Sequence, residues 1–196
     1  MNNLVSSEYL AQLEAHAALH PEWGSDSASM LSIQTLWDAV KESERVLDYG
    51  CGTGSLVQAI NGHHVRGRWK ARAMGYDPRN PSRWPHPHES SRGCWDLVIC
   101  TDVLEHVEED KVPAVLADIA SLLHHEGCAF LAVATGPAIA VLPKTDALPE
   151  RNAHITQHDL NWWLLRIGAA GLATTLDDIK KTEHGFYGLF KRKEEA

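Results

Sequence analysis

The sequence lacks any apolar run long enough to cross a membrane. Its longest apolar stretches, Cys128 to Ala134 and Leu97 to Cys100, are far shorter than the roughly 20 residues of a membrane-spanning helix. The amino terminus, MNNLVSSEYL, also lacks the basic start, apolar core and small-residue cleavage site of a signal peptide. We therefore expect no transmembrane helix, no membrane partner and a cytoplasmic protein.

Cysteine is scarce, and its spacing disfavours disulfides and a zinc site. The four cysteines include no CxxC pair, and most lie in or beside apolar segments, where a free thiol behaves as a small hydrophobe. Histidine pairs such as His63 with His64 and His124 with His125 are present. None combines with cysteines or a second pair at a recognisable ligand spacing, so we expect most of them at the surface.

Positive charge is in the minority, with 18 Lys and Arg against 26 Asp and Glu and a formal net charge of −8. This balance repels a polyanion over long range, although a local basic groove can still bind one. Arg79, Arg83, Trp84 and Arg92 are the only candidates for such a groove, so nucleic acid is a minority hypothesis. The 44% hydrophobic content of 196 residues is enough for one globular domain.

Helical and extended patterns alternate along the chain. Two amino-terminal helices, Ser7 to His20 and Ser29 to Val40, are expected to pack on the core as residues 1–44, separated by Pro21 and the polar run Gly24 to Ser27. In residues 45–196, strands are expected at Arg45 to Tyr49, Ala73 to Tyr76, Leu97 to Cys100, Ala129 to Ala134, Leu172 to Lys180 and Phe186 to Arg192. Helices are expected at Ser55 to Asn61, at Lys111 to His124, and after Asp159 as far as Gly168 to Gly171. Such alternation predicts a mainly parallel sheet covered on both faces, within one domain.

The most informative segment is Val46 to Leu56, with the sequence VLDYGCGTGSL. A strand that ends in glycines turns sharply, and the missing side chains let a nucleotide-like ligand approach the main chain. A dinucleotide-binding fold places its third glycine one position later, where Ser55 stands, and normally needs a second domain for its substrate. The chain has no room for that domain, which disfavours NAD.

The alternating glycines, with Asp48 two residues before the first of them, closely resemble motif I of the class I S-adenosylmethionine-dependent methyltransferases. The resemblance extends over about Arg45 to Arg192. It implies a Rossmann-like, three-layer α/β sandwich with a mainly parallel sheet and an antiparallel final strand, and it implies S-adenosylmethionine as the cofactor.

The resemblance also implies which residues bind the cofactor. Asp48 and the glycine loop border the methionine part, and Asp77, which ends the second strand, accepts hydrogen bonds from the ribose hydroxyls. The residues implied are Asp48, Tyr49, Gly50, Cys51, Gly52, Gly54, Asp77, Thr101 and Asp102. The simpler alternative is that the glycines form only a tight turn and that Asp77 caps a loop.

One segment departs from the family pattern. Between Asp77 and Trp95 the family usually has a helix, a third strand and a second helix, whereas this chain has the proline-rich run PRNPSRWPHPH at positions 78–88. Because proline breaks regular structure, we expect the third strand to be lost or very short. The usual adenine-contacting residue therefore has no counterpart that can be assigned.

The segment DVLEHV, Asp102 to Val107, follows the fourth strand of the family pattern and there lies beside the transferring methyl group. Transfer to a hydroxyl needs an in-line acceptor and a group that removes its proton. His106 is the natural base, and Glu105 and His154 complete the catalytic candidates. The alternative is that His106 begins a helix and shapes the pocket floor, as in family members with unrelated substrates.

A second polar cluster precedes the helix that contains Trp162 and Trp163. Arg151, Asn152 and His154 are candidates for the acceptor wall, because they lie in a loop expected over the carboxyl ends of the strands. In the same stretch, Thr156 is interpreted as the cap of the next helix and His158 as an exposed residue of its first turn.

A metal site is the less favoured alternative at the acceptor. Asp102, Glu105 and His106 share one face if their segment is helical. With His154 they resemble the metal site of small-RNA 2′-O-methyltransferases and of some ubiquinone-pathway O-methyltransferases, where a divalent cation lowers the pKa of the acceptor oxygen. We favour a metal-free site with His106 as base, because the same DxxEH pattern occurs in metal-free members. Asp102 also replaces a longer glutamate of the RNA enzymes.

The sequence therefore predicts methyl transfer from S-adenosylmethionine to a small molecule. O-methylation is favoured because a candidate base is present. Two alternatives remain open: a nucleic-acid (RNA 2′-O) methyltransferase, which should show a basic, aromatic groove, and a non-catalytic module that binds the cofactor without turnover. The sequence specifies neither the acceptor nor the oligomeric state.

Overall fold

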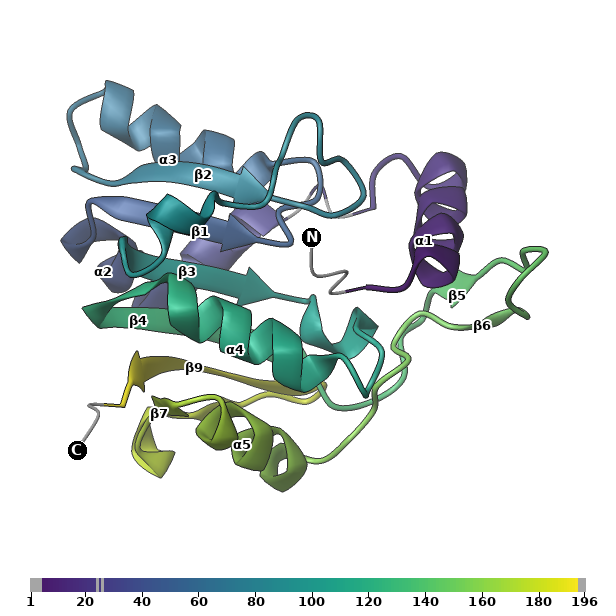
Figure 1. Cartoon of the computed structure of the whole chain (residues 1–196). Coiled ribbons are helices and arrows are strands. Elements are labelled where there is room, and N and C mark those ends of the chain that lie inside the picture. Colours follow the sequence, from purple (N-terminus) through teal and green to yellow (C-terminus); the bar gives the residue numbers. More distant parts are fainter. Residues whose placement is uncertain (1–4, 24, 26, 194–196) are drawn as a thin grey trace.

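The computed structural model describes residues 5–23, 25 and 27–193, so the first four residues of the amino terminus and part of the Gly24 to Ser27 run lie outside it. Its centre is a seven-stranded sheet in the order β2-β1-β3-β4-β9-β7, with β8 also paired to β9 (Figure 1). The strands are β1 (Arg45–Tyr49), β2 (Arg72–Tyr76), β3 (Trp95–Thr101), β4 (Leu123–Ala134), β7 (Leu172–Ala173), β8 (Lys180–Lys181) and β9 (Gly185–Arg192).

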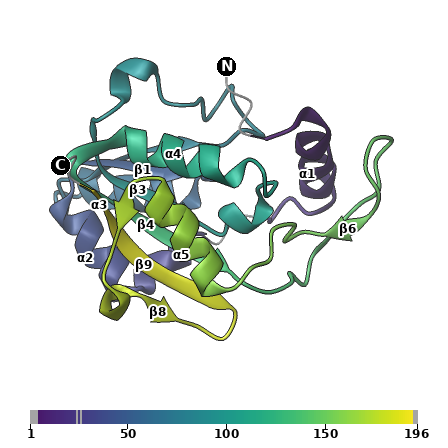
Figure 2. The same ribbon diagram turned by 60° about the horizontal axis from the view of Figure 1, so that its bottom comes forward.

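The first four of these strands are parallel to one another, and β9 pairs with β4 in the antiparallel direction. Alternate residues face opposite sides of the sheet. Val46 and Leu97 pack under α2 (Gln34–Glu42) and α3 (Ser55–Val65), whereas Leu47 and Val98 pack under α4 (Val112–Leu122) and α5 (Leu160–Ala169). Figure 2 shows α4 and α5 together over one face of the sheet. The expected three-layer α/β fold with an antiparallel final strand is confirmed.

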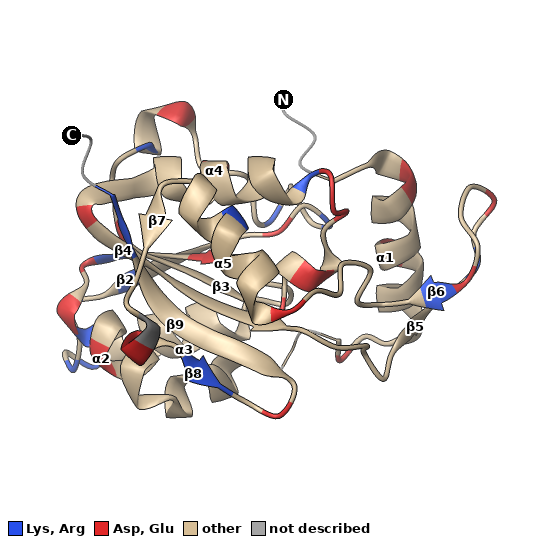
Figure 3. Cartoon of the chain, turned by 90° about the horizontal axis from the view of Figure 1, so that it is seen from below, with Lys and Arg blue, Asp and Glu red and all other residues tan. Residues whose placement is uncertain are grey.

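A small lobe lies beyond the carboxyl ends of the parallel strands (Figure 1). It consists of α1 (Ser7–Leu19) and a hairpin of β5 (Val141–Leu142) with β6 (Arg151–Asn152). Tyr9 and Leu13 of α1 pack on Leu142 and Ala153. Figure 3 shows β6, coloured blue for its arginine, next to α1. The lobe thus covers the edge of the sheet where ligands of open α/β folds bind.

Several boundaries differ from those predicted. The segment Ser29 to Val40 divides into a 3-10 helix, Ser27–Ser32, and α2. The prediction of one strand over Leu172 to Lys180 is wrong, because the extended residues there belong to two short strands, β7 and β8. Between them the chain turns, and the Thr175 hydroxyl donates a hydrogen bond of 2.6 Å to the Asp178 carboxylate.

The acceptor-side loop also differs from its prediction. Arg151 and Asn152 form the short strand β6 and are not in a loop. Thr156 does not cap α5: its buried hydroxyl donates to the Val107 carbonyl oxygen at 2.6 Å. The side chain of Asp159 is the cap, because it accepts from the Trp162 amide at 2.8 Å.

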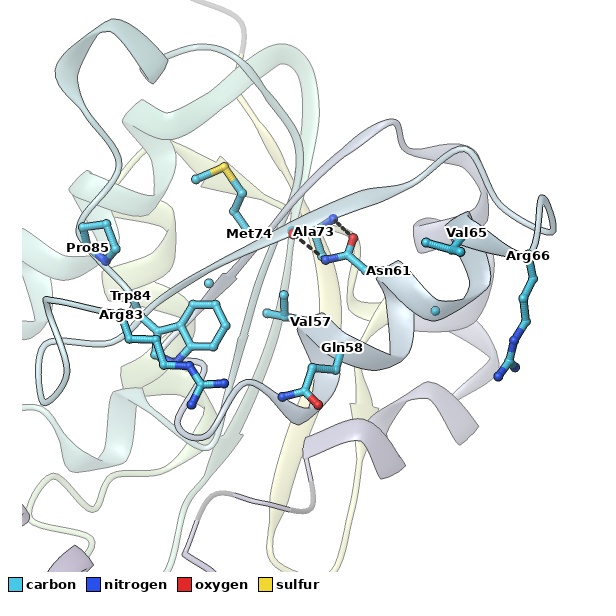
Figure 4. A pocket seen from close by; sticks show the side chains of 12 residues that line it. Val57, Gln58, Asn61, Val65, Arg66, Ala73, Met74, Arg83, Trp84 and Pro85 are labelled. Atoms are coloured by element: carbon cyan, nitrogen blue, oxygen red, sulfur yellow. Dashed lines mark hydrogen bonds between the residues drawn. The ribbon is translucent and has the colours of Figure 1, made fainter.

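The third strand is lost, as predicted. Among the described residues between β2 and β3, the regular structure is a 3-10 turn at Glu89–Ser91. The open edge of β2 is nevertheless partly satisfied, because the Asn61 side chain of α3 bonds to both the N–H and the C=O of Ala73 at 2.9 Å each (Figure 4). The Asp77 amide donates to the Trp84 carbonyl oxygen at 3.1 Å. A side chain and a loop therefore replace the missing strand, which reduces the hazard of an unpaired edge.

Asn61→Ala should destabilise the fold because it leaves both backbone groups of Ala73 without their protein partners. We expect the free energy of unfolding to fall by about 1–3 kcal/mol, measured by urea denaturation. Gln58→Ala, at an exposed position of the same helix, is the matched control. Equal stability of the two variants would contradict the role assigned to Asn61.

Candidate functional site

The glycine loop connects β1 to α3 through backbone conformations that other residues rarely adopt. Gly50, Gly52 and Gly54 have φ angles of 85°, 55° and 84°, in the left-handed region that favours glycine. At Gly54 a Cβ would also lie 2.3 Å from the ring of Trp84. Part of the space that the missing side chains leave is therefore filled by an indole of the same chain.

The Asp77 carboxylate is fully engaged in hydrogen bonds. Its Oδ2 accepts from the Gly52 amide at 2.8 Å and from Arg79 Nη2 at 3.0 Å, and its Oδ1 accepts from Arg79 N at 2.9 Å and Nε at 3.0 Å. A carboxylate has about four lone-pair positions. A ribose hydroxyl that binds Asp77 therefore has to replace one of these bonds, and the guanidinium of Arg79 is the partner on a movable side chain.

Two cavities flank the proline-rich segment. A cavity of about 310 Å³ is lined by Gly52, Thr53 and Asp77 together with Trp23 and Arg79. A larger cavity of about 660 Å³ lies between α3 and β2 (Figure 4) and is mainly apolar. The smaller cavity is the candidate cofactor site because the glycine loop and Asp77 both border it.

Arg83 and Trp84 line both cavities. The sequence interpretation weighed these residues only for a nucleic-acid groove and missed their position beside the glycine loop. The loss of the third strand was the available signal, because a loop that follows Asp77 directly has to run past the carboxyl end of β2.

Asp48 is a buried acid with one unpaired oxygen. Its side chain is buried at the end of β1, and Oδ2 has no hydrogen-bond partner among the described residues. Burial, and secondly the nearby charge of Asp77, raise the pKa of Asp48 to about 7. A positively charged group beside Asp48 would stabilise its ionised form.

Asp102 and Glu105 do not share a helical face. Asp102 follows β3 with a left-handed φ of 54°, and the 3-10 helix Leu104–His106 begins only after it. The condition for a shared face, a helix that includes Asp102, is not met, because the backbone turns at Asp102 before the 3-10 helix begins.

Glu105 joins the end of β4 to the acceptor-side loop. Its Oε1 accepts from the Ala134 amide at 2.9 Å, and its backbone carbonyl accepts from the amides of Ile155 and Thr156. Burial, followed by the charge of Asp102, raises the pKa of Glu105 to about 8. The carboxyl group is therefore mostly protonated at neutral pH, and its Oε2 has no partner within the described part of the chain.

His106 is held in one tautomer. Its Nδ1 lies 2.7 Å from the Ala153 carbonyl oxygen; because a carbonyl only accepts, Nδ1 carries the proton and Nε2 is the basic nitrogen. Burial, and then the neighbouring His154, lower the pKa of His106 to about 4. The rings of Trp23 and His154 lie 5.6 Å and 5.0 Å from the imidazole. The structure thus brings the two predicted histidines together under Trp23.

The four candidate metal ligands are not gathered. In residues 5–23, 25 and 27–193, the one group of three side chains whose ligand atoms lie within 4.8 Å of one another is His124, His125 and Glu126, at the sheet end remote from the glycine loop. The set of Asp102, Glu105, His106 and His154 forms no such group.

A family model described as a methyltransferase domain matches residues 27–174. With this match, the fold and the glycine loop, the chain belongs to the class I S-adenosylmethionine-dependent methyltransferases. It is an enzyme of that class, and S-adenosylmethionine is its cofactor. A comparison with curated proteins finds no match.

Solved structures share the fold at low sequence identity. A 1,6-didemethyltoxoflavin-N1-methyltransferase from Burkholderia thailandensis, with 1,6-didemethyltoxoflavin and S-adenosylhomocysteine bound, is similar at a TM-score of 0.63 and 16% identity over 95% of this chain and 90% of its own. The sugar N-methyltransferase KedS8 from Streptoalloteichus is similar at a TM-score of 0.57 and 15% identity. The match covers 87% of this chain and 88% of KedS8. An O-methyltransferase family protein from Burkholderia thailandensis is similar at a TM-score of 0.60 and 14% identity. That match covers 87% of this chain and 57% of the other protein.

The residues around the glycine loop fit the cofactor. S-adenosylmethionine carries positive charge, and the buried Asp48 offers an oxygen atom without a partner. Asp77, which borders the smaller cavity together with Gly52, lies close enough to Asp48 to act on it electrostatically. None of the helices in the described residues has the length and hydropathy of a membrane-crossing segment.

Asp48→Asn tests the burial of this carboxyl group. Because the pKa of about 7 in the folded protein lies above the ordinary value of 3.8, the folded state holds the proton more tightly, and wild-type stability falls as the pH rises through this range. Asparagine keeps the shape and has no proton to lose. The variant should therefore gain stability relative to the wild type as the pH rises from about 4 to about 8, by up to about 4 kcal/mol in total.

The measurement is urea denaturation at several pH values, with Asp38→Asn at an exposed position as the control. A difference between Asp48→Asn and the wild type that does not change with pH would show that Asp48 is ionised and solvated.

Proposed function

We propose that this enzyme transfers the methyl group of S-adenosylmethionine to a hydroxyl oxygen of a small molecule, with His106 as the general base. The observation that carries the proposal is the fixed tautomer of His106, whose Nε2 is the unprotonated nitrogen. The imidazole lies after β3, at the carboxyl ends of the parallel strands, where ligands of this fold class bind.

When bound, the cofactor supplies a methyl group on a positively charged sulfur. The acceptor oxygen forms a bond to the methyl carbon, the carbon–sulfur bond breaks, and its electron pair stays on sulfur. The acceptor proton moves to Nε2 of His106. Because burial lowers the pKa of His106 to about 4, the imidazole is neutral throughout the neutral pH range and Nε2 is free to accept the proton, as a weaker base than a solvent-exposed histidine.

The same proposal assigns the cofactor contacts. Asp48, with its free Oδ2, is placed near the positive charge of the cofactor, and Asp77 binds the ribose after Arg79 has moved. The remaining contacts are proposed at the loop and at the end of β3: Tyr49, Gly50, Cys51, Gly52, Gly54, Thr101 and Asp102. Glu105, tied to Ala134 and the loop at Ile155, positions His106, and His154 packs against it.

The pH dependence of cofactor binding tests the contact with Asp48. Near a positive charge the Asp48 pKa falls from about 7, so binding releases a proton and becomes tighter as the pH rises from about 6 to about 8. S-adenosylhomocysteine, whose sulfur is uncharged, should show a smaller pH dependence. Calorimetry in buffers of different ionisation enthalpy measures the affinity and the proton release. Equal pH dependence for both compounds would place Asp48 away from the sulfur.

His106→Ala tests the base. Once a screen for S-adenosylhomocysteine release has found an acceptor, the variant should lower kcat by about 10²- to 10⁴-fold and leave the affinity for S-adenosylmethionine unchanged. His184→Ala, at an exposed histidine, is the control and should retain activity. Wild-type turnover in His106→Ala would assign the imidazole to the pocket floor.

A further inference from the structure

The inner face of α1 carries polar side chains into the lobe that covers the acceptor side. Tyr9, Gln12, Leu13 and His16 are buried and follow one helical face at spacings of three and four. His16 contacts Trp23, which in turn contacts His106. This face of α1 therefore lies over the proposed reaction centre.

Arg151 of β6 reaches the same face of α1 and is held there. Its Nε donates to Gln12 Oε1 at 2.8 Å, and Gln12 Nε2 donates to the carbonyl oxygens of Pro143 and Pro149 at 2.9 Å and 2.8 Å. The guanidinium carbon lies 4.6 Å from the centroid of the Tyr9 ring. The orientation of the cation is thus fixed by the protein before any ligand binds.

Arg151 contacts the Tyr9 ring and Gln12 but has no negatively charged partner among the described residues. Its Nη2 is buried and has no hydrogen-bond partner, and no carboxylate of the described residues forms an ion pair with it. The Tyr9 side chain is 0% exposed, and its hydroxyl also has no partner in the part of the chain that the structure describes. Burial raises the pKa of Tyr9, so the phenol keeps its proton and remains a donor.

Two donors without acceptors are costly in a folded protein. A buried donor without a partner loses its bonds to water and gains none in return, and the loss is larger for a charged donor. In folded proteins such groups are satisfied by an ordered water, an ion or a ligand. The missing partner has to be an acceptor, and a negative charge would compensate the guanidinium best.

We propose that Arg151 and Tyr9 bind a carboxylate of the methyl acceptor, so that the substrate class is that of small carboxylic acids. This inference rests on the function proposed above and specifies its substrate. The guanidinium fork matches the two oxygens of a carboxylate. Glu108 lies close enough to act electrostatically on Tyr9, and this negative charge disfavours a doubly charged phosphate at a single arginine.

The chain joins the anion site to the base. Ala153, two residues after Arg151, supplies the carbonyl oxygen that fixes the His106 tautomer. One short segment thus positions both Arg151 and His106. A carboxylate anchored at Arg151 orients the remainder of the acceptor toward Nε2 of His106, which is the positional control that methyl transfer requires.

The test compares carboxylic acids with their primary amides, which keep the shape and lose the charge. Thermal unfolding is measured with saturating S-adenosylhomocysteine and either benzoate or benzamide. Methyl transfer is measured as S-adenosylhomocysteine release with 3- and 4-hydroxybenzoate, salicylate and lactate, each beside its amide. We expect at least one acid to stabilise the protein more than its amide, or to be methylated with a kcat/KM at least about tenfold higher.

Variants locate the effect. Arg151→Gln should abolish the preference for acids, and Tyr9→Phe, which removes only the hydroxyl, should raise the KM or Kd of the acid and leave that of the amide unchanged. Because Tyr9→Phe removes an unsatisfied buried group, it should fold at least as stably as the wild type and gives an answer even if Arg151→Gln does not fold. Arg68→Gln, at an exposed arginine, is the control for loss of positive charge.

The absence of any preference for an acid over its amide, in both measurements, overturns the carboxylate proposal. A preference that Tyr9→Phe and Arg151→Gln leave unchanged overturns it as well. Calorimetry of S-adenosylmethionine with each protein separates this failure from a failure of the proposed function. If the wild type does not bind S-adenosylmethionine, the methyltransferase site itself is contradicted. If it binds the cofactor but does not distinguish acids from their amides, only the anion site is contradicted.

Discussion

Burial of ionisable side chains at the carboxyl ends of the parallel strands is the constraint on which the candidate site depends. Asp48 is the next-to-last residue of β1, and Glu105 and His106 follow β3, at the edge of the sheet beyond which the lobe of α1 and the β5–β6 hairpin lies. In each case loss of solvent shifts the pKa toward the neutral form. A positively charged cofactor that enters such a site would meet groups able to ionise in response, and the imidazole that we propose as the base is uncharged.

The second constraint is the loss of the third strand. Without it, the chain returns from β2 through a proline-rich loop, and Trp84 packs against Gly54 and Gly75 in the space beside the glycine loop. The Trp84 indole nitrogen is buried without a partner among the described residues. One wall of the candidate cofactor cavity is therefore built from loop side chains, where the family usually has a helix and a strand, and this accounts for the absence of an assignable adenine contact.

The sequence predicted the elements whose signals are local. The strand Arg45–Tyr49 and the helix that begins at Ser55 are marked by an apolar run, glycines and a new periodicity within a dozen residues. The third strand's loss followed from prolines in the same way. Sequence also placed His106 and His154 on the acceptor side, and the structure brings their rings to 5.0 Å.

Contacts between distant residues were not predictable in this way. Arg151 and Gln12 are 139 residues apart, and neither pattern nor spacing indicates that α1 carries Tyr9 to Arg151. The helical face assumed for Asp102, Glu105 and His106 failed because a single left-handed residue precedes the 3-10 helix. The sequence assigned the cap of α5 to Thr156 because threonine and aspartate are both favourable cap residues. The choice depends on tertiary structure: the Thr156 hydroxyl bonds to the Val107 carbonyl oxygen, which leaves Asp159 to cap the helix.

The cofactor side and the acceptor side are connected through one chain of contacts. Arg79 occupies the lone pairs of Asp77 and at the same time lies 4.8 Å over the Trp23 ring. Trp23 covers His106. A ribose that takes the hydrogen bonds of Asp77 removes the anchor of Arg79, and Trp23 then loses the cation that packs on it. Coupling between two linked binding sites is reciprocal. A ligand that displaces Trp23 from His106 therefore also changes the stability of the hydrogen bonds between Arg79 and Asp77.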